Sequence, residues 1–553
     1  MEMGKASKVL VIGLDGGTFD ILRPLAEEGR LPTLARLMRE GVCGELTSTI
    51  PPITAAAWTS FATGKNPGKH GLVDFVYFPN YGYSVSVASS KNRRAKAIWN
   101  ILGEEGRKVG VVSVPMTYPP EPVNGFMVTG MMTPPSSKNF AYPPELMGEL
   151  TREVGEYVIH AGEGVLPSDL ERYLDKMRAD IAIRVKCTLY LLRKYDPDFF
   201  MFVFGALDPL QHQFFNYIDV PSQPSDGNEM RERILSVYEE VDARIAEILE
   251  MADEDTTLIF MSDHGFGPLE GFLHLNNWFL DKGYLTLKHD IRSRVKYLLF
   301  RAGFTPEAAH NLARRLRLDL RRRVNRGRAY RKLQRIFLSF EDIDWEATKA
   351  YALGHIGQIY INLRGRQPQG VVEPGAEYEE LREKIGSELL DLVSPVTGER
   401  AIERVYKREE IYRGENLEQA PDLLLIPKGF SHVAFGESEF GSNRLFGPTL
   451  GHTGHHRLNG ILIMQGPEMR SGQTIEGANI VDLAPTILYA MGYPIPRDMD
   501  GRVLTEAFHP QFLEAQPISY GEAASAEEEQ EKAYSEADET EVRERLKGLG
   551  YIA

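Results

Sequence analysis

Short apolar runs alternate with longer amphipathic stretches through the first 290 residues of the chain. Strand-like runs occupy residues 8–14, 108–116, 125–131, 199–204 and 257–261, and helical periodicity occupies residues 20–41 (broken near Pro32), 168–195 and 230–252. This alternation is typical of a mostly parallel sheet covered by helices. The sequence therefore predicts an α/β fold in which a mostly parallel sheet is sandwiched by helices.

The pattern changes after about residue 290, where a basic stretch begins. From Lys288 to Ile336 the chain has 16 Lys or Arg residues against three Asp or Glu residues. Because 553 residues are too many for one simple core, an insertion is expected. We predict a core at 1–289, an inserted cap and substrate region at 290–440, a closing part of the core at 441–510, and an acidic linker with a short helix at 511–553. Within the last region, residues 521–542 carry nine acidic residues against one lysine, so we expect a flexible segment there.

Charge and cysteine content exclude several classes of protein. The net charge of −15 argues against general nucleic-acid binding. Cys43 and Cys187 are the only cysteines, so the chain has no disulfide framework. The apolar run from Val9 to Leu14 is too short for a signal-peptide core or a membrane span. We therefore expect a cytoplasmic protein without a membrane span.

Residues of the kinds that bind metals stand next to several of the predicted strands. In an open α/β sheet, ligands bind outside the carboxyl ends of the strands. Three strands are followed by such residues, and a late strand is preceded by histidines. The candidates are Asp15, the pair Asp208 and His212, the pair Asp263 and His264, and His456, with His452 as second choice and His455 as third. Carboxylates and imidazoles gathered at one edge of the sheet predict a site for divalent metal ions.

Each of these residues also has a purely structural interpretation. Asp15 can cap the following helix, and Asp208 can cap a helix that begins near Pro209. On that helix His212 is four residues from Asp208, so both side chains share one face. The sequence Asp263-His264-Gly265 is also compatible with a plain turn.

Thr54 is the candidate nucleophile. It follows Pro51-Pro52-Ile53 and opens a helical stretch, where a bound phosphoryl group would meet free amide donors. The alternative is an ordinary N-cap threonine. Lys69, in the nearby sequence GKNPGKHG, is a candidate for binding the phosphoryl oxygens. The spacing of that sequence does not match a phosphate-binding P-loop.

Taken in order, these motifs resemble the alkaline phosphatase superfamily, and within it the type I phosphodiesterase and nucleotide pyrophosphatase branch. The matching sequences are GLDGG at 13–17, P-x-x-T ending at Thr54, TGKNPGKHG at 63–71, D-x-x-x-H at 208–212, SDHG at 262–265, a late histidine before a strand ending in Gly-Pro, and DLAPTILYAMGYPIPRDMDG at 482–501. The resemblance covers about residues 8–287 and 440–505. It implies an alkaline-phosphatase-like fold.

The resemblance also implies a threonine nucleophile and two zinc-like ions, with manganese or iron as alternatives. One ion would bind Asp208, His212 and a late histidine, and the other Asp15, Thr54, Asp263 and His264.

One contact of the branch is missing from the sequence. The branch usually has an asparagine four or five residues after the His-Gly of this segment, whereas here Leu72, Val73, Asp74 and Phe75 follow. The sulfatase sequence C/S-x-P-x-R is also absent at Thr54.

The sequence therefore predicts a metal-dependent hydrolase of phosphate esters, with a phosphodiester or nucleotide pyrophosphate ahead of a monoester. The substrate is expected to be an anionic phosphorylated small molecule, and the oligomeric state stays open. One alternative is a phosphomutase of the cofactor-independent phosphoglycerate mutase type, although those enzymes use serine rather than threonine. Another is a non-catalytic metal- or anion-binding protein.

Overall fold

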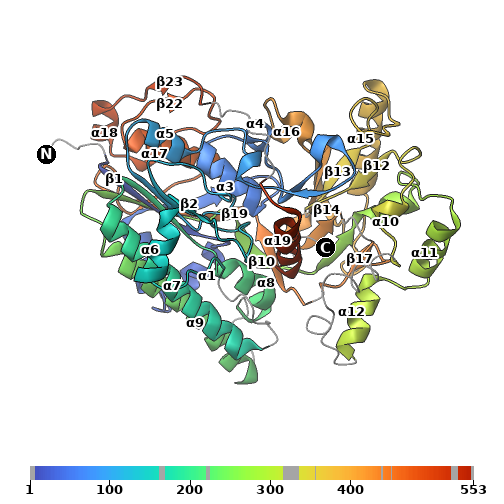
Figure 1. Ribbon diagram of the computed structural model, residues 1–553, viewed down its shortest axis with the longest axis horizontal. Coiled ribbons are helices and arrows are strands. Elements are labelled where there is room, and N and C mark those ends of the chain that lie inside the picture. Colours follow the sequence, from blue (N-terminus) through green and yellow to red (C-terminus); the bar gives the residue numbers. More distant parts are fainter. Residues whose placement is uncertain are drawn as a thin grey trace.

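The computed structural model describes residues 6–160, 169–218, 225–315, 336–354, 356–436, 440–449, 451–524 and 533–549 (Figure 1). Much of the predicted basic stretch, residues 316–335, lies outside the described residues. A large sheet with helices on both faces lies beside a smaller sheet (Figure 1).

In the described part of the chain the large sheet has ten strands. Their order is β20 (Gln473–Thr474), β2 (Val42–Thr47), β19 (Asn459–Gln465), β9 (Thr256–Met261), β1 (Lys8–Leu14), β8 (Phe199–Phe204), β5 (Val109–Val112), β6 (Gly125–Val128) and β7 (Ala141–Tyr142), with β21 (Ala478–Asn479) beside β2. The central strands from β9 to β6 are parallel, whereas β19 runs antiparallel to β9 and β2. The prediction of an α/β fold with a mostly parallel sheet is confirmed.

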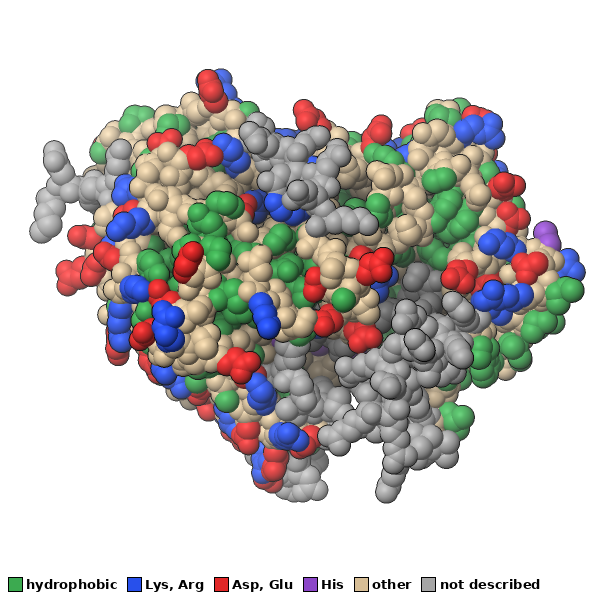
Figure 2. Space-filling view, viewed as in Figure 1, with side chains coloured by type: hydrophobic (Ala, Val, Ile, Leu, Met, Phe, Trp, Pro, Cys, Tyr) green, Lys and Arg blue, Asp and Glu red, His purple; other side chains and the backbone are tan. Residues whose placement is uncertain are grey.

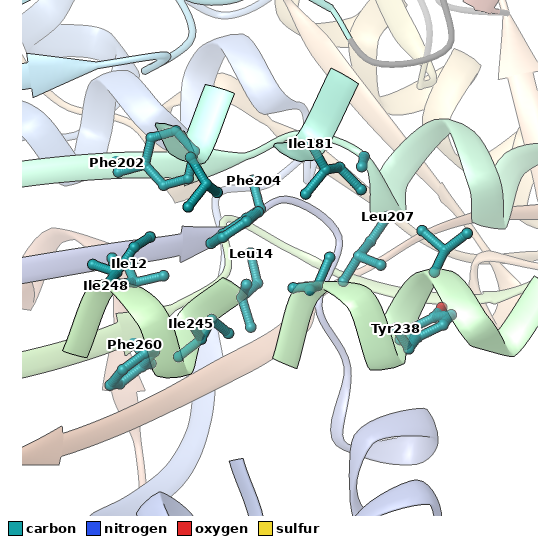
Figure 3. Close-up of a cluster of buried hydrophobic side chains, with 14 of the residues drawn as sticks. Ile12, Leu14, Ile181, Phe202, Phe204, Leu207, Tyr238, Ile245, Ile248 and Phe260 are labelled. Carbon is teal, nitrogen blue, oxygen red and sulfur yellow. The ribbon is translucent and has the colours of Figure 1, made fainter. Parts of the chain in front are cut away.

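Alternate side chains of the central strands point to opposite faces of the sheet, and helices bury both faces. One face packs against α1 (Phe19–Glu27), α2 (Pro32–Glu40), α7 (Leu170–Tyr195), α8 (Leu207–Ile218) and α9 (Ser225–Leu249). There Ile12, Phe202 and Phe260 meet Ile181 and Ile245 (Figure 3). The other face packs against α3 (Thr54–Thr63), α5 (Ile98–Glu104) and α17 (Leu483–Ala490).

Shorter elements complete this part of the molecule. They are α4 (Pro67–His70), β3 (Val76–Tyr77), β4 (Ser86–Val87), α6 (Glu145–Glu153), β10 (Gly265–Pro268), β18 (Gly454–Arg457), β22 (Ile495–Pro496), α18 (Pro510–Ala515) and β23 (Tyr520–Gly521). The strand predicted at 108–116 ends at Val112, because Ser113 takes a positive φ of 63° that breaks the extended backbone.

The smaller sheet is antiparallel and has the order β12 (Ala350–Ala352), β13 (Gln358–Ile361), β15 (Leu423–Pro427) and β14 (Ile402–Lys407). Around it lie β11 (Gly271–His274), α10 (Leu275–Asp281), α11 (Ile291–Arg301), α12 (Pro306–Arg315), α15 (Ala376–Leu390), α16 (Arg408–Ile411), β16 (His432–Phe435) and β17 (Phe446–Gly447). The apolar core of the smaller sheet includes Leu273 and Trp278, which come before the predicted start of the insertion at residue 290. The boundaries at 290 and 440 stay a prediction. Along its outer edge, α11 exposes apolar side chains such as Ile291 and Leu298 (Figure 2).

Residues 350–361 form a hairpin of β12 and β13. Gly354 and Gly357 take positive φ values of 103° and 64° between the two strands, which reverses the chain. The smaller sheet therefore begins with a tight turn.

The C-terminal helix α19 (Glu536–Leu549) begins inside the segment predicted to be flexible. Ser535 and Asp538 bond to each other at its start, and Val542 and Leu546 are fully buried. Residues 525–532 of that segment lie outside the described residues. Among the described helices, none combines the length and apolar character that crossing a membrane requires.

Candidate active site

Three parallel strands end level with one another at one edge of the large sheet. Leu14 of β1 pairs with Phe204 of β8, and Gly13 pairs with Met261 of β9. Asp15 follows β1, Asp208 lies in the first turn of α8 after β8, and Asp263 follows β9. Parallel strands in register therefore carry the predicted carboxylates to one place.

The late histidines reach the same edge because β19 runs in the opposite direction. Residues before an antiparallel strand lie where residues after its parallel neighbours lie. In β18, just before β19, His456 pairs with Phe266 of β10, which directly follows the Asp263-His264 turn. The structure thus brings His456 to His264, and their rings stack with centroids 3.5 Å apart.

Thr54 is the first residue of α3 and is fully buried. Its hydroxyl oxygen lies 3.2 Å from His264 Nε2. A helix N-terminus carries unpaired amide donors and a partial positive charge. A negative charge on or near this hydroxyl is therefore favoured.

Asp15, Asp263 and His264 form one compact group around this hydroxyl. Each offers one ligand atom, and these atoms lie within 4.8 Å of one another. His264 Nε2 is 3.2 Å from Asp263 Oδ2 and 3.8 Å from Asp15 Oδ1. Among the described residues, these two carboxylate oxygens accept no hydrogen bond. Two buried carboxylate oxygens that converge on an imidazole nitrogen fit a divalent cation.

Asp208, His212 and His456 form the neighbouring group. The Nε2 atoms of His212 and His456 are 3.1 Å apart and lie 3.4 and 3.2 Å from Asp208 Oδ1. The Nδ1 atom of His212 faces Gly454 O at 3.0 Å, and that of His456 faces Pro52 O at 2.8 Å. Since a carbonyl can only accept, each Nδ1–H donates to its carbonyl, and each Nε2 faces into the cluster. Two imidazole Nε2 atoms that converge beside a carboxylate also fit a cation.

Burial and mutual repulsion shift the pKa values of this cluster. Burial, and then the charges of Asp263 and Asp208, raise the pKa of Asp15 well above its usual value. Burial and Asp208 raise the pKa of Asp263 to about 8. Burial opposes ionisation of Asp208 as well, but His212 and His456 hold its pKa well below the usual value.

The histidine nearest the hydroxyl is held neutral. Burial and His456 keep the pKa of His264 well below its usual value. Neutral imidazole is the form that binds metal ions.

The other predicted residues lie around the cluster. The rings of His452 and His455 have centroids 5.8 and 5.2 Å from that of His212. The ammonium group of Lys69 bonds to Asp500 Oδ1 at 2.7 Å and to Asp498 O at 2.8 Å. This ion pair ties α4 to the closing segment, and a role for Lys69 in substrate binding stays a prediction.

Several residues that hold the cluster in place were not predicted. Trp58 Nε1 donates to Asp15 Oδ2 at 3.4 Å, Gln211 Nε2 donates to Gly16 O at 2.9 Å, and Ser48 Oγ donates to Asp263 O at 2.5 Å. Trp58 is four residues after Thr54, so helical spacing alone places it on the same face. The partners of Ser48 and Gln211 are distant in sequence and give no local signal.

Comparisons with known proteins identify the family and support the fold. The sequence profile of the type I phosphodiesterase / nucleotide pyrophosphatase family matches residues 9–444. Phosphonoacetate hydrolase from Sinorhizobium meliloti 1021, in complex with phosphonoacetate, has a similar structure at a TM-score of 0.51 and 15% identity, over 88% of this chain and 95% of that chain.

A second solved structure was also found by the structural comparison. Human ectonucleotide pyrophosphatase / phosphodiesterase 5 aligns at a TM-score of 0.48 and 14% identity, over 90% of this chain and 98% of that chain. Among curated proteins no match was found. The profile match covers most of the chain, and the chain therefore belongs to the type I phosphodiesterase / nucleotide pyrophosphatase family.

Proposed function

We propose that this protein hydrolyses phosphodiesters or nucleotide pyrophosphates with Thr54 as the nucleophile and two divalent metal ions. The observation that carries the proposal is the position of the Thr54 hydroxyl. It lies at a helix N-terminus, 3.2 Å from His264 Nε2, beside a compact group of two carboxylates and an imidazole. The family acts on phosphate esters, and its members generally bind divalent metal ions.

Each of the two groups of side chains would hold one metal ion. Asp208, His212 and His456, whose ligand atoms lie within 3.4 Å of one another, would hold one ion. Asp15, Asp263 and His264 would hold the other together with Thr54. Bound there, the ions would supply positive charge that favours the ionised hydroxyl of Thr54 and offsets charge on the phosphoryl oxygens. Three imidazole nitrogens in the set favour zinc, with manganese or iron as alternatives.

The chain's own residues then account for the reaction. The Thr54 hydroxyl gives up its proton to solvent, and its oxygen forms a bond to phosphorus. The bond from phosphorus to the leaving oxygen breaks, and that oxygen departs with the electron pair. The first turn of α3 offers amide donors to the phosphoryl oxygens. Water then attacks phosphorus, the bond between phosphorus and the Thr54 oxygen breaks, and the hydroxyl is restored.

Substitution of Thr54 tests this assignment. With zinc or manganese present, Thr54→Ala should lower the release of p-nitrophenolate from bis(p-nitrophenyl) phosphate about 10³-fold or more, since the nucleophile is lost. Thr54→Ser should keep measurable activity. Rapid acid quenching followed by mass spectrometry should find a peptide with a p-nitrophenyl phosphoryl group on residue 54 in the wild type and in Thr54→Ser, and none in Thr54→Ala.

The same helix provides a matched control. Thr63 is also buried, and its hydroxyl donates to Thr59 O at 2.8 Å, so Thr63→Ala removes a comparable group away from the cluster. It should retain activity. Wild-type turnover in Thr54→Ala would exclude the covalent mechanism.

A screen of monoesters, diesters and sulfate esters identifies the substrate class, and transfer of the phosphoryl group back to the product would indicate a phosphomutase.

A further inference from the structure

The helix α11 presents an apolar stripe to solvent. Ile291 and Leu298 are 83% and 67% exposed, and Val295 and Leu299 are exposed as well. Spacings of four, seven and eight residues place these four side chains on one side of the helix. The stripe continues into Phe304, which is also exposed and whose N–H donates to Leu299 O at 2.9 Å. Figure 2 shows green side chains along this outer edge of the molecule, and a continuous exposed apolar surface of this kind marks a place of interaction.

The inner face of α11 is largely polar. Three residues of the helix are buried, and two of them, Ser293 and Lys296, are polar, whereas the third, Phe300, is apolar. The ammonium group of Lys296 donates to Asp342 Oδ2 at 2.8 Å, and Ser293 Oγ donates to Asp342 Oδ1 at 3.2 Å. A surface helix ordinarily turns its apolar side toward the core, so the orientation of α11 is reversed. Because breaking a buried ion pair is costly, the contacts of Asp342 hold the apolar stripe outward.

Exposed arginines border the stripe on both sides. Arg294 and Arg301 lie four and three residues from Leu298, on one side of the stripe. Arg292 lies three residues from Val295, on the other side. The outer face of α11 is therefore an apolar stripe between two basic edges.

This combination fits the surface of an anionic lipid bilayer. Apolar side chains on one face of a helix enter the boundary between headgroups and acyl chains, and arginines beside them reach the anionic headgroups. Residues 288–304 include five Lys or Arg residues against one Asp, whereas the whole chain has a net charge of −15, so the attraction is confined to this helix. A second copy of the chain that docked through the same stripe would bring the basic edges of both copies together, and like charges disfavour that contact.

We propose that the outer face of α11 binds the surface of an anionic lipid bilayer. The residues that contact the bilayer are Ile291, Val295, Leu298 and Leu299 in the stripe, and Arg292, Arg294 and Arg301 at its edges. A helix bound in this way lies in the plane of the interface, so a membrane-spanning helix is not needed. The proposal is independent of the chemistry at Thr54, since α11 belongs to the part of the molecule built on the smaller sheet.

Sedimentation with lipid vesicles tests the binding. The probes are vesicles of phosphatidylcholine alone and vesicles of phosphatidylcholine with equimolar phosphatidylglycerol, each mixed with the full chain. The partition coefficient on the anionic vesicles should be about 10-fold higher or more, because each arginine near an anionic surface adds to the attraction. Added salt should weaken the binding, since exposed charges are screened.

Substitutions on the stripe and at its edge should each weaken this binding. Leu298→Ser and Ile291→Ser should lower the partition coefficient on anionic vesicles about 5- to 10-fold, because less apolar surface leaves water. Arg294→Gln should lower it about 5-fold and should reduce its dependence on salt.

The chain offers a matched control for each kind of substitution. Val396, between α15 and β14, is 84% exposed and lies outside the stripe, so Val396→Ser removes an equally exposed apolar side chain. Arg400→Gln makes the same change of charge at a side chain that is 70% exposed. Both controls should bind anionic vesicles like the wild type. Melting temperatures should be unchanged in all five variants, because exposed substitutions of this kind have little effect on stability.

Two other outcomes would overturn the proposal. One is equal sedimentation with both kinds of vesicle, or binding that Leu298→Ser and Ile291→Ser leave unchanged. The other is a wild-type protein that ignores vesicles but self-associates in sedimentation velocity, with Leu298→Ser monomeric. In that case the stripe is a contact between copies of the chain and not a membrane-binding surface.

Discussion

At the scale of single residues, the central fact is the close burial of Asp15 and Asp263. The charge of Asp263 is one of the causes that raise the pKa of Asp15, and Asp263 itself is fully buried. Like charges in a low-dielectric interior destabilise the fold unless a cation compensates them. The proposed metal site therefore lowers the stability of the metal-free protein.

Asp263→Asn should separate these two effects. The new amide oxygen can still accept from Gly16 N–H, which lies 3.2 Å from Asp263 Oδ1. At pH 7 the metal-free variant should be about 1–4 kcal/mol more stable than the metal-free wild type, because folding no longer has to protonate this carboxyl or bury its charge. Elemental analysis should show the loss of at least one of two metal equivalents. Unchanged metal content, or a less stable metal-free variant, would contradict this reading of the site.

At the scale of secondary-structure elements, Asp422 organises the smaller sheet. It precedes β15 and is fully buried. Its carboxylate accepts from Arg366 at 2.8 and 2.6 Å, from the Tyr378 hydroxyl at 2.6 Å and from Ile361 N–H at 2.6 Å. One carboxylate thus connects the starts of β15 and α15 with the end of β13.

The stability of this sheet should depend on pH through Asp422. Burial alone would raise its pKa, but Arg366, Arg408 and the Tyr378 hydroxyl together outweigh burial and hold the pKa below the usual 3.8. A lowered pKa in the folded state gives stability that is present above about pH 4 and is lost as the pH falls through the folded value. Asp422→Asn should therefore destabilise the smaller sheet by about 3–5 kcal/mol at pH 7, with a smaller difference below pH 4.

The loss of stability is measured by monitoring denaturation through hydrogen exchange in β13 and β15. Asp391→Asn is the control, since Asp391 forms an exposed ion pair with Arg400 at 3.2 Å and both side chains are 70% exposed. That variant should change stability by less than about 1 kcal/mol. A pH-independent effect of Asp422→Asn would show that packing, not charge, accounts for the loss.

At the scale of the whole molecule, the part built on the large sheet lies beside the part built on the smaller sheet (Figure 1). The large sheet has an apolar core on each face, and the smaller sheet has its own. Every candidate metal ligand comes from the part built on the large sheet. The candidate ligands follow β1, β8 and β9 or lie in β18, so a bound ion would join segments that are hundreds of residues apart.

Zinc binding should therefore protect the part built on the large sheet and the part built on the smaller sheet unequally against hydrogen exchange. Adding zinc to the metal-free protein should slow hydrogen exchange in β1, β8, β9 and β19 most, because a ligand that binds only the folded state adds its binding free energy to those elements. Exchange in β14 and α15 should change much less. Mass spectrometry of peptides from both parts makes the comparison, and equal protection of both would show that they unfold as one unit.

Local patterns in the sequence determined the parallel sheet and the kinds of side chain at its edge. Apolar runs of strand length fix β1, β8 and β9, and a residue that follows a parallel strand must lie at the carboxyl edge whatever the rest of the fold does. The helical spacing of Asp208 and His212, and the start of α3 at Thr54, are likewise local properties.

Contacts between distant segments decided the rest. The antiparallel direction of β19 brought His456 to His264, and ordinary alternation of apolar residues does not encode strand direction. Gly354 and Gly357 made a hairpin of residues 350–361, because positive φ values depend on the packing around them. The start of α19 and the pairing of Lys69 with Asp500 have the same physical reason: burial and charge compensation come from partners that only the tertiary structure supplies.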